Sequence, residues 1–204
     1  QKKIVKKKIG QNLLILHWPF DQRDKIWDSF DEYTLYIKKI EIMLHKIATI
    51  KEVNSISYRV SLNHENIDKL NYFKKISKKI KFDFSENTYQ KSINNSKIAV
   101  FTYNSSGFYE NLSNNIPSIM LIDKNYLMEL NITSRKHFKN LIKCNIIFTD
   151  VNNLYNFLKK NWNSIEDWWE SDPTKFSVKT FVKYNAISSE HPIKIISSKI
   201  NNII

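Results

Sequence analysis

Residues 96–123 read SKIAVFTYNSSGFYENLSNNIPSIMLID, and this stretch decides the fold class. The apolar run in Lys97–Tyr103 is typical of a buried strand, and Ser118–Ile122 predicts a second one. Between them we expect a loop over Asn104–Gly107 and a helix over Phe108–Asn114. A strand, a loop, a helix and another strand make a βαβ unit, whose two strands run parallel.

The same alternation of strands and helices extends from this unit toward both ends of the chain. Further strands are expected at Leu13–Trp18, Ser55–Leu62, Ile80–Phe84 and Ile146–Phe148. Helices are expected over Asp31–Ile47, Ile67–Ser77, Asn87–Asn95, Ser134–Cys144, Val151–Trp162, Ile165–Trp169 and Pro173–Tyr184. The sequence therefore predicts an α/β fold, a Rossmann-like three-layer sandwich with a mostly parallel sheet.

Length and composition predict a single domain of this kind. A chain of 204 residues can bury a sizeable core, and 42% hydrophobic with 25% charged residues is the balance of a folded globular protein. We expect a basic N-terminal segment or linker over residues 1–10, the domain over 11–188 and a tail over 189–204. Because the chain begins with Gln rather than Met, we also expect it to be a segment of a longer protein.

The sequence favours a cytoplasmic protein without a metal. No apolar run approaches the ~18 residues that cross a bilayer, and the charged start lacks the apolar block of a secretory signal. Cys144 is the one cysteine, so no internal disulfide can form, and its apolar surroundings predict a buried structural thiol rather than a nucleophile. With five scattered histidines, no zinc-ligand spacing is present.

The formal net charge of +12 calls for a cause. Nucleic acid, anionic lipid and a phosphorylated substrate are all partners that would suit it. Much of the lysine lies in Lys2–Lys8 and Lys74–Lys81, runs that are more typical of solvated faces than of residues that read bases. The abundance of Asn, Ile and Lys also fits an AT-rich coding genome. Aromatic residues among lysines at Tyr72–Lys75 could stack on bases, but no nucleic-acid-binding motif frames them.

The loop that begins at Asn104 has the composition of an anion site. Ligands of Rossmann-like folds lie beyond the carboxyl ends of the strands, and one of the two glycines of the chain, Gly107, falls in such a loop. Small residues let phosphate oxygens approach the N–H groups at the start of the next helix, and Ser105 and Ser106 add hydroxyl donors. Glu110, expected in the first helical turn, could accept bonds from ribose or sugar hydroxyls. An ordinary turn and helix cap would use the same residues, so spacing alone leaves both interpretations open.

Several segments together resemble the signature of a family of bacterial surface-carbohydrate transferases, which act in polysaccharide and lipopolysaccharide assembly. In that family a strand reaches a Tyr, a Thr-Thr-Phe-Leu-Glu-like turn follows, and an Asn-Ile-Pro-Thr-like step opens the next strand. Later come a Trp–acid–Trp-Trp pattern and a closing Arg/Lys-Phe-x-x-x-Tyr. The matching segments here are Ser96–Tyr103, Ser106–Leu112, Asn114–Ile119, Ile146–Asp150, Trp162–Trp169 and Phe181–Tyr184.

The resemblance implies the C-terminal half of a GT-B glycosyltransferase, the half that holds the nucleotide-sugar donor. It implies that the turn Ser105–Gly107 contacts donor phosphate, that Asn104 belongs to the same nucleotide-sugar site, and that Glu110 binds ribose or sugar hydroxyls. A basic residue at the end of an earlier strand commonly meets the diphosphate in such enzymes. Arg59 holds that place, and its guanidinium suits bidentate phosphate contact, although a surface ion pair is the alternative interpretation.

Two departures from the family pattern affect the donor site. The family shows a Tyr-Pro-His-Asp-like run after the basic residue, whereas this chain reads Ser61-Leu62-Asn63-His64-Glu65 without the proline. His64 is a candidate for a phosphate or hydroxyl contact, and a surface histidine is the alternative. Ser106-Gly107 stands where the family has two threonines, which removes one hydroxyl.

Other candidates are weaker. His17 with Asp21 and Asp24 lies at a strand end and could meet an acceptor or a sugar, or His17 could simply cap the strand. Glu166 and Asp167 resemble an acid–base pair only superficially, because the neighbouring tryptophans at helical spacing are expected to pack the terminal helix onto the domain.

The leading hypothesis is a cytoplasmic donor-binding domain of a glycosyltransferase that needs no metal or other cofactor. Its expected partners are a nucleotide-sugar donor, a carbohydrate or lipid-linked acceptor, the missing N-terminal half and an anionic membrane, placing it peripherally at the inner membrane face. The general base usually comes from that other half, so no catalytic residue is assigned. A non-enzymatic basic α/β module that binds nucleic acid or another polyanion is the alternative. A sugar-nucleotide epimerase would need two such halves and catalytic acids that we do not find.

Overall fold

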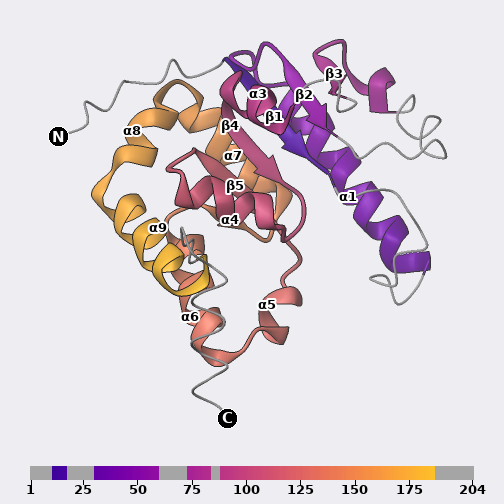
Figure 1. Cartoon of the computed structure of the whole chain (residues 1–204). Helices are drawn as coiled ribbons and strands as arrows, with labels where there is room; N and C mark the ends of the chain where they lie inside the picture. The colour runs from indigo at the N-terminus through magenta and orange to yellow at the C-terminus, as the bar shows by residue number, and fades with distance from the viewer. Residues whose placement is uncertain (1–10, 18–29, 60–72, 84–87, 187–204) are drawn as a thin grey trace.

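All the strands that the structure describes lie parallel in one sheet, in the order β3-β2-β1-β4-β5-β6. The structure is a computed structural model that describes residues 11–17, 30–59, 73–83 and 88–186 (Figure 1). The strands are β1 (Asn12–Leu16), β2 (Ile56–Arg59), β3 (Ile80–Asp83), β4 (Ser96–Phe101), β5 (Ser118–Leu121) and β6 (Ile147–Phe148). The predicted Rossmann-like α/β sandwich is therefore confirmed.

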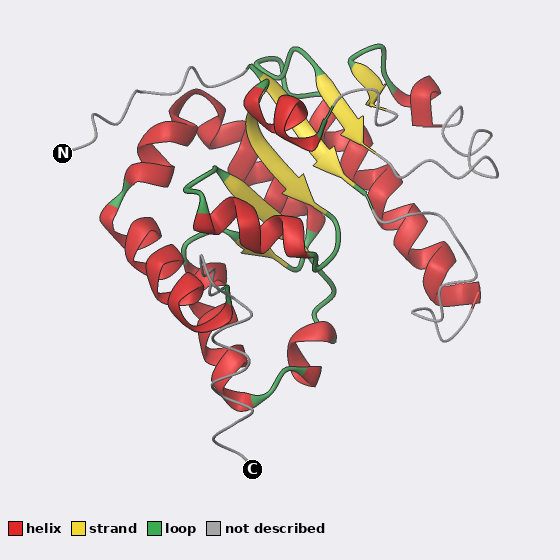
Figure 2. Ribbon diagram, in the orientation of Figure 1, coloured by secondary structure: helices red, strands yellow, loops and turns green. Residues whose placement is uncertain are grey.

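Alternate residues of the central strand β1 point into two separate hydrophobic cores. Leu13 and Ile15 join one core, whereas Leu14 and Leu16 join the other. Both sets are buried because helices cover both faces of the sheet, as Figure 2 shows. This explains why the central strands read as continuous apolar runs rather than as alternating ones.

Different helices complete each core. The core of Leu13 contains residues of α1 (Phe30–Ala48) and α7 (Val151–Asn161). The core of Leu14 contains residues of α3, α4, α6 and α9. The remaining bounds are α3 (Tyr89–Asn94), α4 (Ser106–Ser113), α5 (Tyr126–Glu129), α6 (Ile132–Lys143), η2 (Trp162–Ser164), α8 (Ile165–Glu170) and α9 (Asp172–Asn185).

The direction in which the sheet is wound reverses between β1 and β4. From β1 the chain proceeds outward through β2 to β3, and it then returns to the other side of β1 to begin β4. The helix that follows β1 in the chain, α1, packs on one face of the sheet, while the loop after β4 leads to α4 on the opposite face. In an open parallel sheet, this reversal is the point where ligands are bound.

The C-terminal helices are fastened by tryptophan indoles and by one buried ring. The indole of Trp169 donates to Asn115 Oδ1 at 3.0 Å, and that of Trp168 donates to Cys144 O at 2.9 Å. Phe181 of α9 is fully buried between Tyr109 of α4 and Phe138 of α6. The tryptophans thus pack the end of the chain onto the domain, as the sequence predicts.

The left-handed backbone at Asn115 and Asn145 ends two helices. Their φ angles are 54° and 59°, and each residue directly follows a helix C-cap. Asparagine tolerates this conformation better than other residues with a side chain. These asparagines therefore do what glycine does at most helix ends, in a chain with just two glycines.

Several predictions differ from the structure or fall on residues outside its described part. The helix α5 was not predicted, and α4 begins at Ser106 instead of Phe108. Cys144 is only partly buried, and its thiol lies 3.1 Å from Ser177 Oγ. The segments 1–10 and 189–204 lie outside the described residues, as does most of the predicted helix Ile67–Ser77, of which residues 73–76 are helical. Among the helices described, none combines the length and the apolar character needed to cross a membrane.

Replacing Phe181 with Ala is expected to lower the free energy of unfolding by about 3–5 kcal/mol, because the change leaves a cavity where three helices meet. Phe176 lies on the same helix but is 71% exposed. Phe176→Ala is therefore expected to change the free energy of unfolding by less than about 0.5 kcal/mol. Urea denaturation of both variants measures the difference. Equal effects of the two substitutions would show that α9 does not pack as described.

Candidate functional site

The loop between β4 and α4 presents the start of a helix at the carboxyl edge of the sheet. Ser105 is the N-cap residue of α4, with extended backbone at φ −139° and ψ 155°. Its carbonyl accepts from Phe108 N at 3.1 Å, but its side chain makes no capping hydrogen bond. The first N–H groups of a helix have no acceptor within the helix, so those of Ser106 and Gly107 remain available to an anion.

Two buried oxygen atoms of this loop make no hydrogen bond with any part of the chain that the structure describes. They are Asn104 Oδ1 and Ser105 Oγ. The Asn104 amide donates to Tyr126 Oη at 2.5 Å through its nitrogen. Burial raises the pKa of the Tyr103 phenol, and the nearby hydroxyl of Ser105 partly opposes that rise. No hydrogen bond of normal geometry joins the two groups. Buried polar atoms are normally paired, so these two oxygens suit contacts to a bound ligand.

A buried chain of hydrogen bonds fixes the position of α4. Tyr89 Oη donates to Asn111 Oδ1, and Asn111 Nδ2 donates to Ser118 Oγ, both at 2.9 Å. Asn111 is 1% exposed and Ser118 is fully buried. Burial raises the pKa of Tyr89, so the phenol stays protonated and remains a donor. The chain joins α3, α4 and β5 behind the loop.

Gly107 packs beside the Tyr89 phenol. A Cβ atom on this residue would lie 3.4 Å from Phe101 Cε1 and 3.4 Å from Tyr89 Oη, which is ordinary van der Waals distance. Tyr89 Oη also lies 3.4 Å from Gly107 O, a longer contact than its 2.9 Å hydrogen bond to Asn111. The packing of α3 against α4 therefore does not by itself require a glycine here.

Glu110 does not lie in the first turn of α4. The helix begins at Ser106, so Glu110 is its fifth residue, and it is exposed. The prediction was wrong here because it started the helix two residues too late. The carboxylate still lies close enough to raise the pKa of Tyr89, so it is near the same end of α4 as that phenol.

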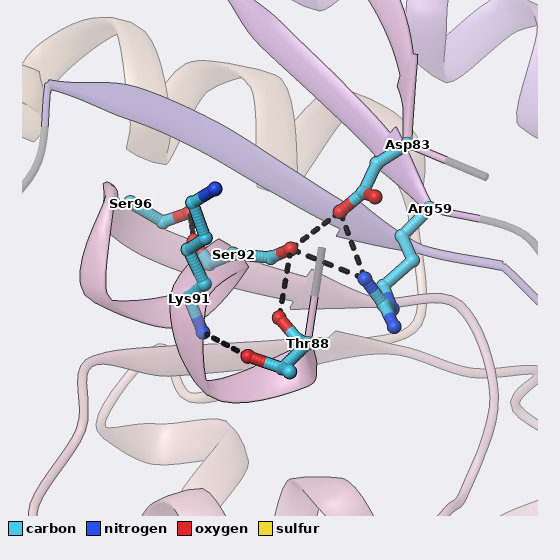
Figure 3. A network of polar contacts seen from close by, with 6 residues as sticks. All are labelled: Arg59, Asp83, Thr88, Lys91, Ser92 and Ser96. Atoms are coloured by element: carbon cyan, nitrogen blue, oxygen red, sulfur yellow. Dashed lines mark hydrogen bonds and ion pairs between the residues drawn. The ribbon is translucent and has the colours of Figure 1, made fainter. Parts of the chain in front are cut away.

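Arg59 forms a largely buried polar network at the ends of β2 and β3 (Figure 3). Its Nη1 donates to Asp83 Oδ2 at 2.9 Å and to Ser92 Oγ at 3.1 Å, and Ser92 Oγ also donates to Asp83. The side chains of Arg59 and Asp83 are 17% and 5% exposed. The ion pair considered from the sequence is thus present, but it is not a surface pair: it ties α3 to the strand ends.

A second chain of hydrogen bonds crosses the reversal point between β1 and β4. Thr102 Oγ1 donates to Leu16 O at 3.2 Å, and Tyr36 Oη lies 2.7 Å from Thr102 Oγ1 and 3.3 Å from His17 Nδ1. A carbonyl oxygen can only accept, so the Thr102 hydroxyl donates to Leu16 O. Tyr36 then donates to Thr102 Oγ1. His17 then donates from Nδ1–H to Tyr36.

Burial keeps His17 a neutral imidazole. Burial lowers the pKa of His17 to about 3, and the ring is 3% exposed and stacked on Tyr36 and Tyr58. The proton sits on Nδ1, which leaves Nε2 as the basic nitrogen. Through Tyr36, His17 therefore holds α1 to the carboxyl edge of the sheet, in addition to ending β1.

Lys39 of α1 reaches the same edge at the end of β5. Its Nζ donates to Ile122 O at 3.2 Å and lies 3.9 Å from Asp123 Oδ2. Burial lowers the pKa of Lys39, and the charges of Asp123 and Asp150 oppose that effect. A cation therefore stands at the carboxyl ends of β5 and β6, where the sequence pointed to none.

Part of the predicted site lies outside the described residues, namely His64, Asp21 and Asp24. Asn104 and Ser105 directly precede α4, and Ser106 and Gly107 are its first two residues rather than the end of the predicted loop. Arg59 is linked to them indirectly: its charge and that of Glu110 both act on Tyr89, between α3 and α4.

A hollow of about 450 Å³ lies elsewhere, along the edge strand β6. It is lined by residues such as Phe148, Asn153, Phe157 and Lys160, and by none of the predicted site residues that the structure describes. We favour the β4–α4 loop, since it combines the reversal point of the sheet, a helix start and buried oxygens without partners.

Comparison with known proteins agrees with a catalytic role. A family model described as LIC12162 family transferase matches residues 21–200. The chain belongs to the LIC12162 transferase family. No curated protein matches the chain. The match covers every strand but β1 together with the whole β4–α4 loop, so the candidate site lies within the family domain.

Sequence reasoning missed several residues that shape the site of this LIC12162 family transferase. Asn111 stands on the apolar side of α4, between Phe108 and Leu112, and a polar residue at such a spacing signals a buried partner. Thr102 directly follows β4 at the beginning of the loop. Tyr36 and Tyr89 gave no local signal, because their partners are distant in the sequence.

Asn111→Ala is expected to lower the free energy of unfolding of the LIC12162 family transferase by about 2–4 kcal/mol, because it leaves the buried Ser118 hydroxyl without its donor and removes the 2.9 Å acceptor of Tyr89. Asn114→Ala on the same helix removes an exposed amide and is expected to cost less than about 1 kcal/mol. Urea denaturation compares them, and a similar small loss in both would refute the buried chain.

His17 makes the stability of the protein depend on pH. Its pKa is about 3 in the folded state and near 6.5 when unfolded, so the stabilisation is complete above pH 6.5 and is lost as the pH falls toward 3. His17→Asn keeps a donor for Tyr36 but cannot titrate. Between about pH 7.5 and about pH 5, the wild type is expected to lose about 2 kcal/mol more than this variant. Denaturation at both pH values measures this, and parallel losses would mean that His17 is not buried as a neutral ring.

Proposed function

We propose that this transferase is a glycosyltransferase and that the chain is its donor-binding half, the C-terminal half of a GT-B fold. The observation that carries the proposal is the helix start at the reversal point of the sheet, flanked by two buried oxygens without partners among the described residues. A sugar nucleotide has a diphosphate for the helix start and hydroxyls for polar side chains. The family match supports transfer chemistry, and the resemblance to surface-carbohydrate transferases supports a sugar as the group transferred.

In the proposed complex, the diphosphate lies against the first turn of α4. The N–H groups of Ser106 and Gly107 and the hydroxyl of Ser105 would donate to its oxygens, in the field of the helix dipole. The amide oxygen of Asn104 would accept from a hydroxyl. These donors are already in place before binding, so they can stabilise the charge that develops on the leaving nucleotide without further rearrangement.

Glu110 and Arg59 take different parts in the proposal. Glu110 is exposed one turn further along α4, where a carboxylate can accept from ribose or sugar hydroxyls. Arg59 holds Ser92 and hence α3, whose Tyr89 supports the loop from behind. A direct contact of Arg59 with the diphosphate, and a contact from His64, remain predictions.

The reaction would be completed by groups outside this domain. The general base and much of the acceptor site are expected on an N-terminal half, so the present chain alone should bind donor without transferring sugar. The proposed setting is surface polysaccharide or lipopolysaccharide assembly on the cytoplasmic side of the membrane. The proposed chemistry does not require a metal, because helix N–H groups can take up the phosphate charge.

Ser105→Ala is expected to weaken binding of the preferred nucleotide sugar about fivefold to tenfold, the effect of one lost hydrogen bond, and to leave stability unchanged, because this hydroxyl has no partner in the described structure. Isothermal titration with UDP-, GDP- and CMP-sugars measures the affinity. Ser113→Ala, at the exposed far end of α4, is the matched control and should bind like the wild type.

The alternative of a polyanion-binding module is tested in the same experiment with a single-stranded oligonucleotide. A steeply salt-dependent response to the oligonucleotide, with none to any nucleotide sugar, would reject the donor site. Unchanged affinity in Ser105→Ala would instead place the donor away from the start of α4.

A further inference from the structure

One side of the molecule combines exposed lysines with exposed apolar side chains. We call it the α6–α9 face. It consists of Ile132, Lys136, Lys139 and Lys143 on α6 and of Phe176, Lys179, Lys183 and Tyr184 on α9, all of them exposed. The positions recur at helical spacing, so each helix contributes one continuous stripe.

The two stripes form a single surface because the helices lie antiparallel and in contact. At one end, the ring of His137 stacks on that of Tyr184 with centroids 4.9 Å apart. At the other end, Cys144 Sγ lies 3.1 Å from Ser177 Oγ. Figure 1 shows α6 and α9 at the edge of the molecule, away from α1.

The charge of this face is almost entirely positive. The sequence of α6 holds Arg135 and three lysines with no acid, and that of α9 holds three lysines with one acid, Asp172, at its start. Lys175 is the exception to an open positive face, since it pairs with Glu170 at 2.6 Å. The other lysines of these helices project where an anionic surface could approach all of them together.

The apolar side chains distinguish among anionic partners. Ile132 is 85% exposed, Phe176 71% and Tyr184 58%, and Met128 on the neighbouring α5 is 68% exposed. Aliphatic side chains projecting between lysines gain nothing from a nucleic-acid backbone. They gain free energy when they enter the boundary between lipid headgroups and acyl chains, while the lysines remain among the headgroups.

The face also extends to the candidate site. Arg135 Nη2 donates to Met128 O at 2.6 Å and to Leu130 O at 3.0 Å, which holds the corner between α5 and α6. Two residues before Met128, Tyr126 accepts a hydrogen bond from Asn104 of the β4–α4 loop. The apolar tip at Met128 and Ile132 therefore lies beside the carboxyl edge of the sheet.

We propose that the α6–α9 face binds a membrane surface rich in anionic lipid, with Met128, Ile132 and Phe176 entering the interface. The lysines provide the attraction and the apolar side chains fix the depth. If the site is the donor site proposed above, this orientation opens it toward the membrane, which suits an acceptor carried on a lipid. The binding itself does not depend on that function.

Flotation of the whole chain with vesicles tests the proposal. We expect binding to phosphatidylcholine vesicles that contain phosphatidylglycerol, much weaker binding to phosphatidylcholine alone, and a decline with salt. A triple variant, Lys136→Gln, Lys139→Gln and Lys179→Gln, should lower the partition coefficient at least about tenfold, since each lysine near such a surface contributes to the attraction. The pair Ile132→Ser and Phe176→Ser should weaken the binding that remains at moderate salt.

Matched controls lie on the opposite face of the sheet. Lys159→Gln with Lys160→Gln on α7 removes exposed charge, and Leu35→Ser on α1 removes a side chain that is 66% exposed. Both should bind vesicles like the wild type. Circular dichroism and thermal melting of each variant verify that the fold is intact, which is expected because every substituted side chain is exposed.

Several results would overturn the proposal. One is equal loss of binding in the α7 control, since total charge would then be responsible rather than this face. A second is equal binding to both kinds of vesicle. A third is unchanged binding in the triple variant, because the attraction would then come from other lysines, such as those of residues 2–8. Sedimentation showing a dimer that the apolar pair of substitutions dissociates, without lipid binding, would make the face a contact between copies. Binding of nucleotide sugar is measured in a separate titration, and its absence would contradict the donor site without contradicting membrane binding by this face.

Discussion

The structure depends most on a buried amide. Asn111 is 1% exposed, yet both ends of its side chain are hydrogen-bonded, to Tyr89 of α3 and to Ser118 of β5. A buried amide is tolerated only when it is satisfied, so α3, α4 and β5 have few arrangements open to them. Apolar packing alone would allow α4 to slide along the sheet, whereas two directed hydrogen bonds do not. The position of the helix start, and with it the candidate site, follows from this constraint.

A second directed chain acts on the same loop from the other face of the sheet. It consists of the hydrogen bonds that run from His17 through Tyr36 and Thr102 to Leu16 O, and it holds α1 against the beginning of the loop. The loop is thus held at Thr102 from one face and through Asn111 from the other. Between these two points lie Asn104 and Ser105, whose oxygens are left without partners in the described structure. A site held in place by hydrogen-bonded neighbours, with polar atoms of its own left without partners in the described structure, is prepared to bind a ligand at little cost in ordering.

Periodicity was sufficient to predict the sheet, because each central strand is a short apolar run with both faces buried. It failed at the start of α4, where Gly107 reads as a turn residue although it is helical. That error moved Glu110 into the first turn. The short helix α5 buries none of its residues, so no apolar pattern marks it. The partner of Arg59 was out of reach for a different reason: Asp83 lies on another strand, and only the register of β2 against β3 brings the two side chains together. Local sequence thus predicts elements and their order, while side-chain contacts between elements depend on register and helix placement.

The distribution of charge argues that the basic character is more than a compositional bias. A coding bias toward lysine acts on every segment, and α1 does carry three lysines, but three acidic residues accompany them. In α6 the basic residues have no acidic companion at all, although a helix with i,i+4 pairs would be more stable alone. Exposed isoleucine and phenylalanine on the same side add a cost in water that a lysine-rich code does not explain. The proposed contact with an anionic membrane would account for the charges and the apolar side chains of this face together.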